Sequence, residues 1–213
     1  MTPILLPQGT VEAVLVTPPC GSVSKPVDEL VCYVGLGIDG DKHAGRHMVD
    51  AREDVARMIG LPKGVEIANL RQFSAVSRHE LDEISERMGL STPIKAGLLG
   101  ENLVISGIPN FSSLPAGTQL VFRRGSPPGV YRSTILYVAA ENNPCKVPAQ
   151  NILAWVQEHK YRIDKTGKPF AKAANGSRGA VGLVKASGKI GVGDAVFAIL
   201  PPLHEDPNAS DSE

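Results

Sequence analysis

Hydrophobic residues in this chain are gathered in short runs, and most of these runs end at glycine or proline. Runs of this kind, rich in valine, isoleucine and leucine, are typical of β-strands. About eight short strands are predicted in this way. The segments concerned are 10–17, 30–34, 65–76, 103–107, 119–123, 134–140, 180–184 and 188–200, the last of which a Gly-Asp turn at 193–194 divides into a short strand and a further strand.

A few segments show helical spacing instead, and strand-like segments separate them. One helix is predicted over 50–59. A second begins at a capping box formed by Ser77 and Glu80 and ends at Gly89. A third is predicted to begin at Pro148, because the apolar residues that follow are spaced to pack on a sheet.

The helices do not alternate regularly with the strands, so a doubly wound sheet is disfavoured. We predict a mainly β fold, a closed or nearly closed β-barrel of short strands with two or three peripheral helices. Residues 1–203 are expected to form a single domain. Residues 204–213 are polar and acidic without periodicity, which predicts a disordered tail.

The charges of the chain balance, with 22 Lys and Arg against 22 Asp and Glu. No overall field attracts nucleic acid or an anionic membrane, so neither is an expected partner. Any anion site must therefore be a local cluster of basic groups. No apolar run is long enough for a membrane span, and the N-terminus lacks the basic start of a signal peptide. A reducing cytoplasm is the expected location.

The three cysteines, Cys20, Cys32 and Cys145, have no spacing that suggests a disulfide framework or a structural zinc site. Cys32 lies in an apolar run and is expected in the core, whereas Cys20 is expected on a surface loop. Cys145 follows a strand that ends before Pro144. Its neighbour Lys146 favours the thiolate, the form that attacks electrophiles and binds metals. An unreactive loop cysteine is the alternative interpretation.

A glycine-rich segment at 35–47 lets backbone amides approach a ligand closely. Within it, Lys42, His43, Arg46 and His47 could help to hold a phosphate or another anion. The spacing of the two histidines could also suit a metal on one helical turn, but the glycine between them weakens a helix. The segment lacks the glycine patterns of nucleotide-binding loops, so no nucleotide site is predicted.

Further polar residues stand at or near the ends of predicted strands, far apart in the sequence. They are Arg71, Glu101, Asn102 and Arg178, and Gln72 follows Arg71 in the run 65–76. An inward-pointing Arg71 would need an anion or a carboxylate as its partner, and an outward-facing Arg71 is the alternative. Strand ends from distant positions meet at the rim of a barrel, so we expect these residues near His43 and Cys145.

Several short motifs occur in an order that resembles a known family. They are Gly-Ile-Asp-Gly-Asp-Lys-His-Ala-Gly at 37–45, Arg-Gln at 71–72, Gly-Glu-Asn-Leu at 100–103, Leu-Pro-Ala-Gly-Thr at 114–118, Asn-Pro-Cys at 143–145, Ser-Arg-Gly-Ala-Val-Gly at 177–182 and Gly-Lys-Ile-Gly-Val-Gly-Asp-Ala-Val at 188–196. This ordered set is similar to the MOSC domain. That is the C-terminal domain type of molybdenum cofactor sulfurases, and it also occurs as stand-alone bacterial proteins.

The resemblance implies a strand-rich fold that binds a molybdenum cofactor of the molybdopterin type. It also implies a cysteine that carries sulfur or ligates molybdenum, and Cys145 takes that position. By the same correspondence, the cofactor-binding residues are Lys42, His43, Arg71, Gln72, Glu101, Asn102 and Arg178, and Asp41 precedes the first of them in its motif. Some relatives have Arg-x-Arg before Asn-Pro-Cys, where this chain has Ala140, Glu141 and Asn142.

Three functions fit these residues, and the sequence leaves the choice open. The first is a molybdenum-cofactor-binding sulfur carrier with a persulfide on Cys145. A separate pyridoxal-phosphate-dependent cysteine desulfurase would load it, because the chain has no room for a fused one. The second is a molybdenum-dependent reductase of N-hydroxylated compounds, with Cys145 as the metal ligand and an external reductase as partner. The third is a non-enzymatic barrel that binds another anion or a partner.

Overall fold

The computed structural model describes residues 4–49, 64–124, 133–164 and 166–202. The helix predicted over 50–59 and the tail predicted at 204–213 lie outside the described residues. Both stay predictions, as does the domain boundary at residue 203.

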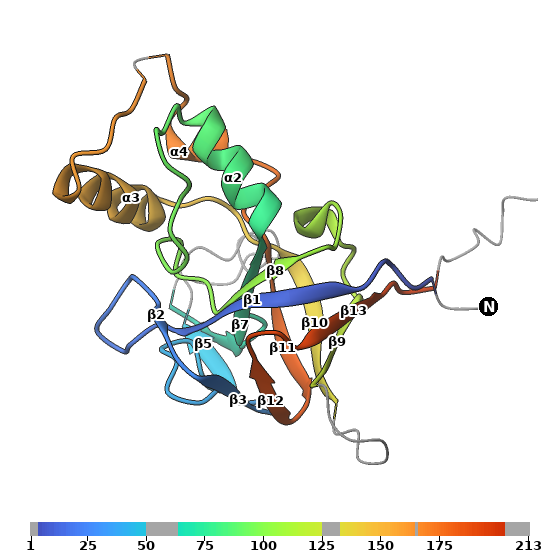
Figure 1. Cartoon of the computed structure of the whole chain (residues 1–213). Helices are drawn as coiled ribbons and strands as arrows, with labels where there is room; N and C mark the ends of the chain where they lie inside the picture. The colour runs from blue at the N-terminus through green and yellow to red at the C-terminus, as the bar shows by residue number, and fades with distance from the viewer. Residues whose placement is uncertain (1–3, 50–63, 125–132, 165, 203–213) are drawn as a thin grey trace, which may run out of the picture.

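A closed barrel of seven strands forms the centre of the molecule (Figure 1). Its strands, in order round the barrel, are β1 (Gly9–Val16), β8 (Leu103–Ser106), β7 (Phe73–Ser77), β11 (Ala180–Ala186), β10 (Thr134–Glu141), β9 (Gln119–Arg123) and β13 (Ala195–Ile199). Pairing of Gly9 with Val196 and of Thr10 with Ala195 joins β1 to β13 and closes the ring. Neighbouring strands are antiparallel except β7 and β8, which are parallel. The predicted barrel is confirmed.

Alternating side chains fill the interior of the barrel. In β10, Thr134, Leu136 and Val138 are buried, whereas the residues between them are partly exposed. Phe73 and Cys32 belong to the same large buried cluster, as predicted for Cys32. A strand turns every second side chain to one face, so burial of that face favours closure of the sheet on itself.

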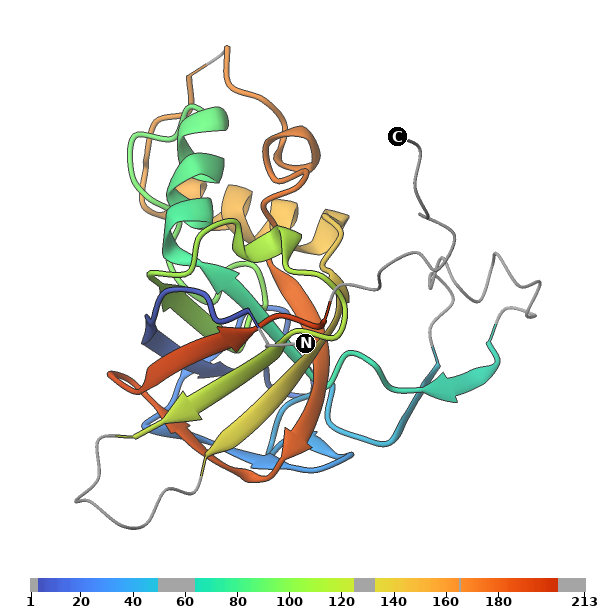
Figure 2. The same ribbon diagram turned by 90° about the vertical axis from the view of Figure 1, so that its right-hand side faces the viewer.

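Smaller sheets extend the barrel. β12 (Gly188–Gly191), β3 (Glu29–Tyr33) and β4 (Gly37–Ile38) form one of them, and β2 (Lys25–Pro26) pairs with the end of β1. β5 (His47–Val49) pairs with β6 (Glu66–Ala68), and this ribbon projects from the barrel (Figure 2).

The single strand predicted over 65–76 is wrong, because the segment divides into β6 and β7. Asn69 causes the break. Its side-chain Nδ2 donates hydrogen bonds to the carbonyl oxygens of His43 and Gly45, and its Oδ1 accepts one from the backbone N–H of Arg71. The bond from the Arg71 N–H, two residues on, is the local turn that asparagine commonly forms, whereas the other two bonds are long-range contacts. Arg71 therefore lies in the irregular segment before β7 and not inside a strand.

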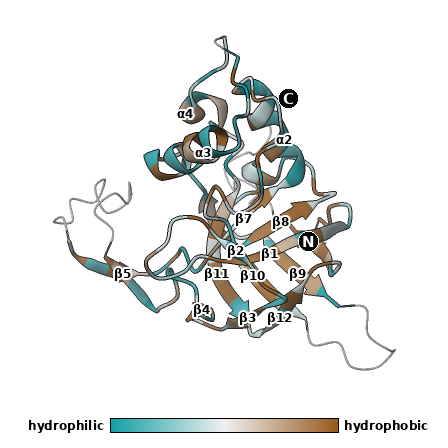
Figure 3. Ribbon diagram, turned by 60° about the vertical axis from the view of Figure 1, so that its left-hand side comes forward, coloured by the Kyte–Doolittle hydropathy of each residue, from teal (hydrophilic) through white to brown (hydrophobic). Residues whose placement is uncertain are grey.

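The helices lie together over one end of the barrel (Figures 1 and 2). They are α2 (Arg78–Arg87), α3 (Lys146–Glu158), α4 (Phe170–Ala173) and the short 3-10 helix η1 (Phe111–Ser113). α2 begins with the predicted capping box of Ser77 and Glu80. A second buried cluster, including Leu81, Ile152 and Phe170, packs α2, α3 and α4 on the outside of the barrel, whereas Phe111 of η1 belongs to the first cluster. Figure 3 shows the strands as mainly hydrophobic and the helices as mixed, as expected for a covering layer.

α3 begins at Lys146, two residues before the predicted start at Pro148. Proline is tolerated in the first turn of a helix, where its missing N–H has no intrahelical partner to lose. The residue before the helix is Cys145, whose backbone is extended, with φ of −131° and ψ of 176°. None of the helices in the described part of the chain is long and apolar enough to span a membrane.

Candidate functional site

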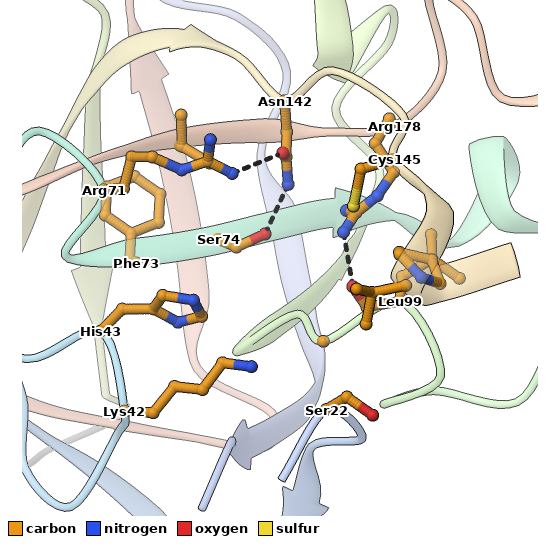
Figure 4. A pocket seen from close by; sticks show the side chains of 14 residues that line it. Ser22, Lys42, His43, Arg71, Phe73, Ser74, Leu99, Asn142, Cys145 and Arg178 are labelled. Carbon is orange, nitrogen blue, oxygen red and sulfur yellow. Dashed lines mark hydrogen bonds between the residues drawn. The ribbon is translucent and has the colours of Figure 1, made fainter. Parts of the chain in front are cut away.

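A pocket of about 130 Å³ lies where the start of α3 meets β7, β11 and several loops (Figure 4). Its lining comes from segments far apart in the sequence. The lining residues are Ser22, Lys42, His43, Arg71, Phe73, Ser74, Leu99, Gly100, Asn142, Cys145, Val147, Pro148, Arg178 and Val181. Five residues predicted for the site are therefore together here: Lys42, His43, Arg71, Cys145 and Arg178.

Cys145 is exposed, and its side chain lines the pocket (Figure 4). β10 ends at Glu141, and the next residues carry the chain to the first turn of α3. Cys145 is the N-cap of this helix. The N-terminal end of a helix carries partial positive charge from its backbone N–H groups, which stabilises negative charge beside it. An anion on or next to the sulfur is therefore favoured by the local backbone.

Arg178 is a buried cation in the same pocket, only 5% exposed. Its Nη2 donates a hydrogen bond to the carbonyl oxygen of Leu99, while Nε and Nη1 have no hydrogen-bond partner among the described residues. Burial lowers the pKa of Arg178 to about 10, although the negative charges of Glu101 and Cys145 act in the opposite direction. Buried donors without acceptors are costly, so these two atoms are suited to an anionic ligand.

Gly179 fixes the position of Arg178. Its φ is 89°, a left-handed conformation, and a Cβ at this position would collide with the carbonyl oxygen of Ala75. The backbone N–H of Gly179 donates to the hydroxyl of Ser112 at 2.6 Å, and its carbonyl oxygen accepts from the N–H of Asn142 at 2.8 Å. Glycine is required here because only it can take this conformation so close to β7.

Glu101 lies behind Arg178 and does not line the pocket. Its side chain is completely buried, Oε1 accepts a hydrogen bond from the N–H of Gly97 at 2.6 Å, and Oε2 has no partner in the described part of the chain. Burial raises the pKa of Glu101, although N–H groups and the charge of Arg178 oppose this rise. The residue therefore holds the 97–101 loop and sets the field at Arg178 from behind.

His43 lies on the other side of the pocket and is oriented by Asp41. The backbone N–H of His43 donates to Asp41 Oδ1 at 2.8 Å, and its ring Nδ1 is 3.1 Å from the same oxygen. Burial alone would raise the pKa of Asp41, but hydrogen bonds from His43, Thr17 and Asn102 hold it below its ordinary value. With Asp41 ionised, the proton on Nδ1 points to the carboxylate, which leaves Nε2 for the pocket.

Asn102 also lies behind the lining and connects its parts. Its Nδ2 donates to Asp41 Oδ2 at 2.7 Å and to the carbonyl oxygen of Leu15 at 3.2 Å. Its Oδ1 accepts from the N–H of Ser74 at 3.0 Å. Asn102 thus joins the carboxylate that orients His43 to the strand that carries Ser74, and it acts through these residues.

Gln72 is the third predicted residue that lies behind the lining. It is 3% exposed, and its Oε1 accepts a hydrogen bond from the N–H of Val184 at 3.1 Å. Its Nε2 donates to the carbonyl oxygen of Gly45 at 3.4 Å. Gln72 therefore ties the glycine-rich segment to β11.

Asn142 was not predicted for the site, yet it links two lining residues. Its Oδ1 accepts a hydrogen bond from Arg71 Nη2 at 3.1 Å, and its Nδ2 donates to Ser74 Oγ at 3.0 Å (Figure 4). Its own side chain is buried at 3% exposure. Asn142 holds Arg71 over the pocket, and the motif Asn-Pro-Cys begins one residue later.

A second unpredicted group fixes α3 at the rim of the pocket. Ser22 Oγ donates to Asn151 Oδ1 at 2.9 Å, and Asn151 Nδ2 donates to the carbonyl oxygens of Ser22 and Leu98, each at 3.0 Å. Lys42 Nζ donates to the carbonyl oxygen of Gly21 at 2.9 Å. No sequence motif marks Ser22 or Asn151, because their pairing joins positions 129 residues apart.

The charge of the pocket is positive. Lys42, Arg71 and Arg178 line it together with His43, and none of the lining residues that the structure describes is acidic. His47 was considered as a metal partner of His43, but its ring Nδ1 lies 3.5 Å from Glu66 Oε1. In the described ranges, no group of three or more His, Cys, Asp or Glu side chains is placed to hold a metal ion. The donor set favours an anion beside a soft sulfur atom.

These residues fit the anionic and metal-binding ends of a molybdopterin-type cofactor. The unpartnered Arg178 donors suit an oxyanion such as a phosphate, and the Cys145 sulfur suits molybdenum. Sites that enclose a whole organic ligand usually have volumes of about 300 Å³ or more. At about 130 Å³, the pocket encloses a small group, and the rest of a large ligand would lie outside it.

Comparisons with known proteins agree with the motifs and the barrel. The model of the MOSC domain family matches residues 62–197. YuaD from Bacillus subtilis (strain 168), whose name places it among metal-sulfur cluster biosynthesis proteins, is 33% identical over 175 residues, which cover 82% of this chain and 81% of YuaD.

Solved structures similar to this one include two that show how far the fold is shared. The crystal structure of the YuaD protein from Bacillus subtilis has a TM-score of 0.79 at 29% identity, and the match covers 94% of this chain and 100% of that chain. The crystal structure of YiiM from Geobacillus stearothermophilus shares the fold, with a TM-score of 0.55 at 16% identity over 91% of this chain and 75% of that chain. From the family match and the similarity to YuaD, we conclude that this chain belongs to the MOSC domain family.

Proposed function

We propose that this protein binds the molybdenum cofactor and carries sulfur on Cys145 as a persulfide. One observation supports this more than any other: the exposed Cys145 thiol shares a pocket with Arg178, a buried cation that has two unpartnered donors. A persulfide is anionic in its reactive form, and so are the acidic groups of molybdopterin. Both are stabilised by the same basic lining.

The residues divide between two tasks. Arg178, Arg71 and Lys42 would bind the phosphate of the cofactor, and Cys145 would hold the sulfur beside them. When bound, the cofactor supplies the molybdenum that accepts this sulfur. His43, held by Asp41, would present Nε2 as a proton acceptor or donor at the mouth of the pocket.

The proposed partner is a separate pyridoxal-phosphate-dependent cysteine desulfurase, and the proposed location is the cytoplasm. Cys145 is exposed, so a persulfide on another protein could reach it. The name of YuaD refers to metal-sulfur cluster biosynthesis. The similarity of this chain to YuaD therefore supports the sulfur-handling role proposed here.

Sulfur loading tests the proposal directly. The protein is incubated with a cysteine desulfurase and cysteine, and its intact mass is measured. We expect the wild type to gain one sulfur atom, Cys145→Ser to gain none, and Cys20→Ser to behave as the wild type. Cys20 is the matched control because it is also an exposed free thiol. An adduct that persists in Cys145→Ser would overturn the sulfur-carrier role. No adduct on a Cys145 that still reacts with iodoacetamide would overturn the desulfurase as its donor.

Metal and pterin analysis distinguishes the reductase alternative. The protein and its Cys145→Ser variant are purified from a host that makes the cofactor. Molybdenum that is stoichiometric in the wild type and lost in Cys145→Ser, without any persulfide, would assign Cys145 to metal ligation instead.

A further inference from the structure

The pocket combines a small volume with an unusual concentration of positive charge. It encloses about 130 Å³ and is lined by Lys42, Arg71 and Arg178. This volume suits an anion of a few heavy atoms better than a complete cofactor. The lining therefore favours a compact, doubly charged anion.

The pocket also offers donors that such an anion could use. Arg178 is 5% exposed, and its Nε and Nη1 have no partner among the described residues. By contrast, Asn142 is already bonded to Arg71 and Ser74, and Ser22 is bonded to Asn151. The spare hydrogen-bonding capacity is thus concentrated at a buried guanidinium, which binds oxyanions strongly.

The nucleophile lies beside this guanidinium. Figure 4 shows the Cys145 sulfur next to the end of the Arg178 side chain, and the two groups interact electrostatically. The start of α3 adds positive potential at the same place. An anion held by Arg178 would therefore lie within reach of the sulfur.

We propose that Cys145 takes its sulfur directly from a small sulfur oxyanion of the thiosulfate type, bound through its oxygens to Arg178 and Lys42. This inference rests on the proposed sulfur-carrier function and adds a second donor beside the cysteine desulfurase. Thiosulfate carries two negative charges and a terminal sulfur atom that a thiolate can attack. It is also compact enough for the pocket.

The transfer needs no oxidant or reductant. The Cys145 thiolate attacks the terminal sulfur of thiosulfate, and a new sulfur–sulfur bond forms to Sγ. The original sulfur–sulfur bond breaks, and its electron pair leaves with sulfite. The reactants, one thiolate and one dianion, become one persulfide anion and one sulfite dianion, so atoms and charge balance. Basic groups placed at the oxygens would stabilise the charge that develops on the leaving sulfite.

The test measures sulfite release and protein mass after addition of thiosulfate. The wild type is expected to release one sulfite for each Cys145 persulfide formed, and Cys145→Ser is expected to release none. Arg178→Gln should lower the second-order rate constant of loading about 10- to 100-fold, because it removes charged hydrogen bonds to the donor.

Exposed residues supply variants with little risk to folding. Lys42 is exposed and lines the pocket, whereas Arg46 is exposed on the same segment and does not line it. We expect Lys42→Gln to weaken thiosulfate binding about threefold, and Arg46→Gln to leave it unchanged. Equal effects of Lys42→Gln and Arg46→Gln, or full loading of a folded Arg178→Gln variant, would overturn the assignment of the anion site.

A parallel reaction with a cysteine desulfurase separates this inference from the function on which it rests. If the desulfurase loads Cys145 and thiosulfate releases no more sulfite than it does with Cys145→Ser, the thiosulfate inference is wrong and the carrier function stands. If neither donor loads Cys145, both are wrong. Loading by thiosulfate that sulfate inhibits competitively is the result that the inference predicts.

Discussion

The barrel interior around Cys32 and the pocket around Cys145 place the same side chain in opposite surroundings. Cys32 is 1% exposed among apolar residues, and burial raises the pKa of its thiol to about 12. Cys145 is exposed at the start of α3, next to Arg178. Because the thiolate is the nucleophile, surroundings and not residue type decide which cysteine can react.

The two buried carboxylates near the pocket show the same dependence on surroundings. Asp41 accepts hydrogen bonds from Thr17, Asn102 and both the backbone and the ring of His43, which keep its pKa low. Glu101 has one oxygen without a partner, and burial raises its pKa. Asp41 is thus a fixed charge that orients His43, whereas burial disfavours the charged form of Glu101, which lies behind Arg178 and does not line the pocket.

The largest expected effect is the difference in reactivity between the two thiols. With a pKa of about 12 for Cys32, about one such thiol in ten thousand is ionised at pH 8. Iodoacetamide should therefore modify Cys145 in the native protein and leave Cys32 unmodified, as measured by peptide mass spectrometry. After unfolding, both should react alike. If Cys145 is protected in the native protein, or if Cys32 is modified at the same rate as Cys145, the two thiols do not differ in reactivity as proposed.

A smaller effect is expected when the carboxylate that orients His43 is changed. Asp41→Asn should lower the free energy of unfolding by about 3 kcal/mol at pH 7, because it disrupts charged hydrogen bonds in a buried network. Since the pKa of Asp41 is lowered on folding, its contribution is present above pH 3.8 and is lost as the pH falls through the folded value.

Urea unfolding at several pH values measures this contribution. Asp39→Asn is the matched control, because Asp39 is exposed two residues away. The nitrogen chemical shifts of His43 should also change in Asp41→Asn, since the proton on Nδ1 loses its acceptor. Unchanged shifts and stability would show that Asp41 does not orient the ring.

The smallest effect is expected at Asn142, which holds Arg71 over the pocket. Asn142→Ala should lower the free energy of unfolding by about 2 kcal/mol, because it takes partners from Arg71 and from the Ser74 hydroxyl. Sulfur loading should slow at the same time. Asn143→Ala serves as the control, since Asn143 is the exposed neighbour. Equal stability and loading in the two variants would contradict the role of Asn142.

The sequence indicated the barrel and the residues of the pocket lining better than it indicated the network behind the pocket. Strand-end positions led us to expect His43, Arg71, Cys145 and Arg178 near one another, and these residues line the pocket. The same argument included Glu101 and Asn102, and family resemblance added Gln72, but these three residues lie behind the lining. Which side of a bend a polar side chain faces depends on tertiary packing, and local sequence does not show it.

The unpredicted features have the same physical origin. Asn142 reaches Ser74 because β10 pairs with β11 and β11 pairs with β7, a register that no local pattern reveals. Likewise, the break between β6 and β7 depends on Asn69 bonding to carbonyl oxygens of the glycine-rich segment. Such long-range polar contacts override local strand propensity.

The most direct measurement is the intact mass of the protein after exposure to a desulfurase and cysteine, with Cys145→Ser and Cys20→Ser in parallel. A persulfide carrier at Cys145 that a desulfurase loads predicts one added sulfur atom on the wild type and on Cys20→Ser, and none on Cys145→Ser. Sulfur found on Cys20 in place of Cys145, or no sulfur on a wild type whose Cys145 reacts with iodoacetamide, would contradict it.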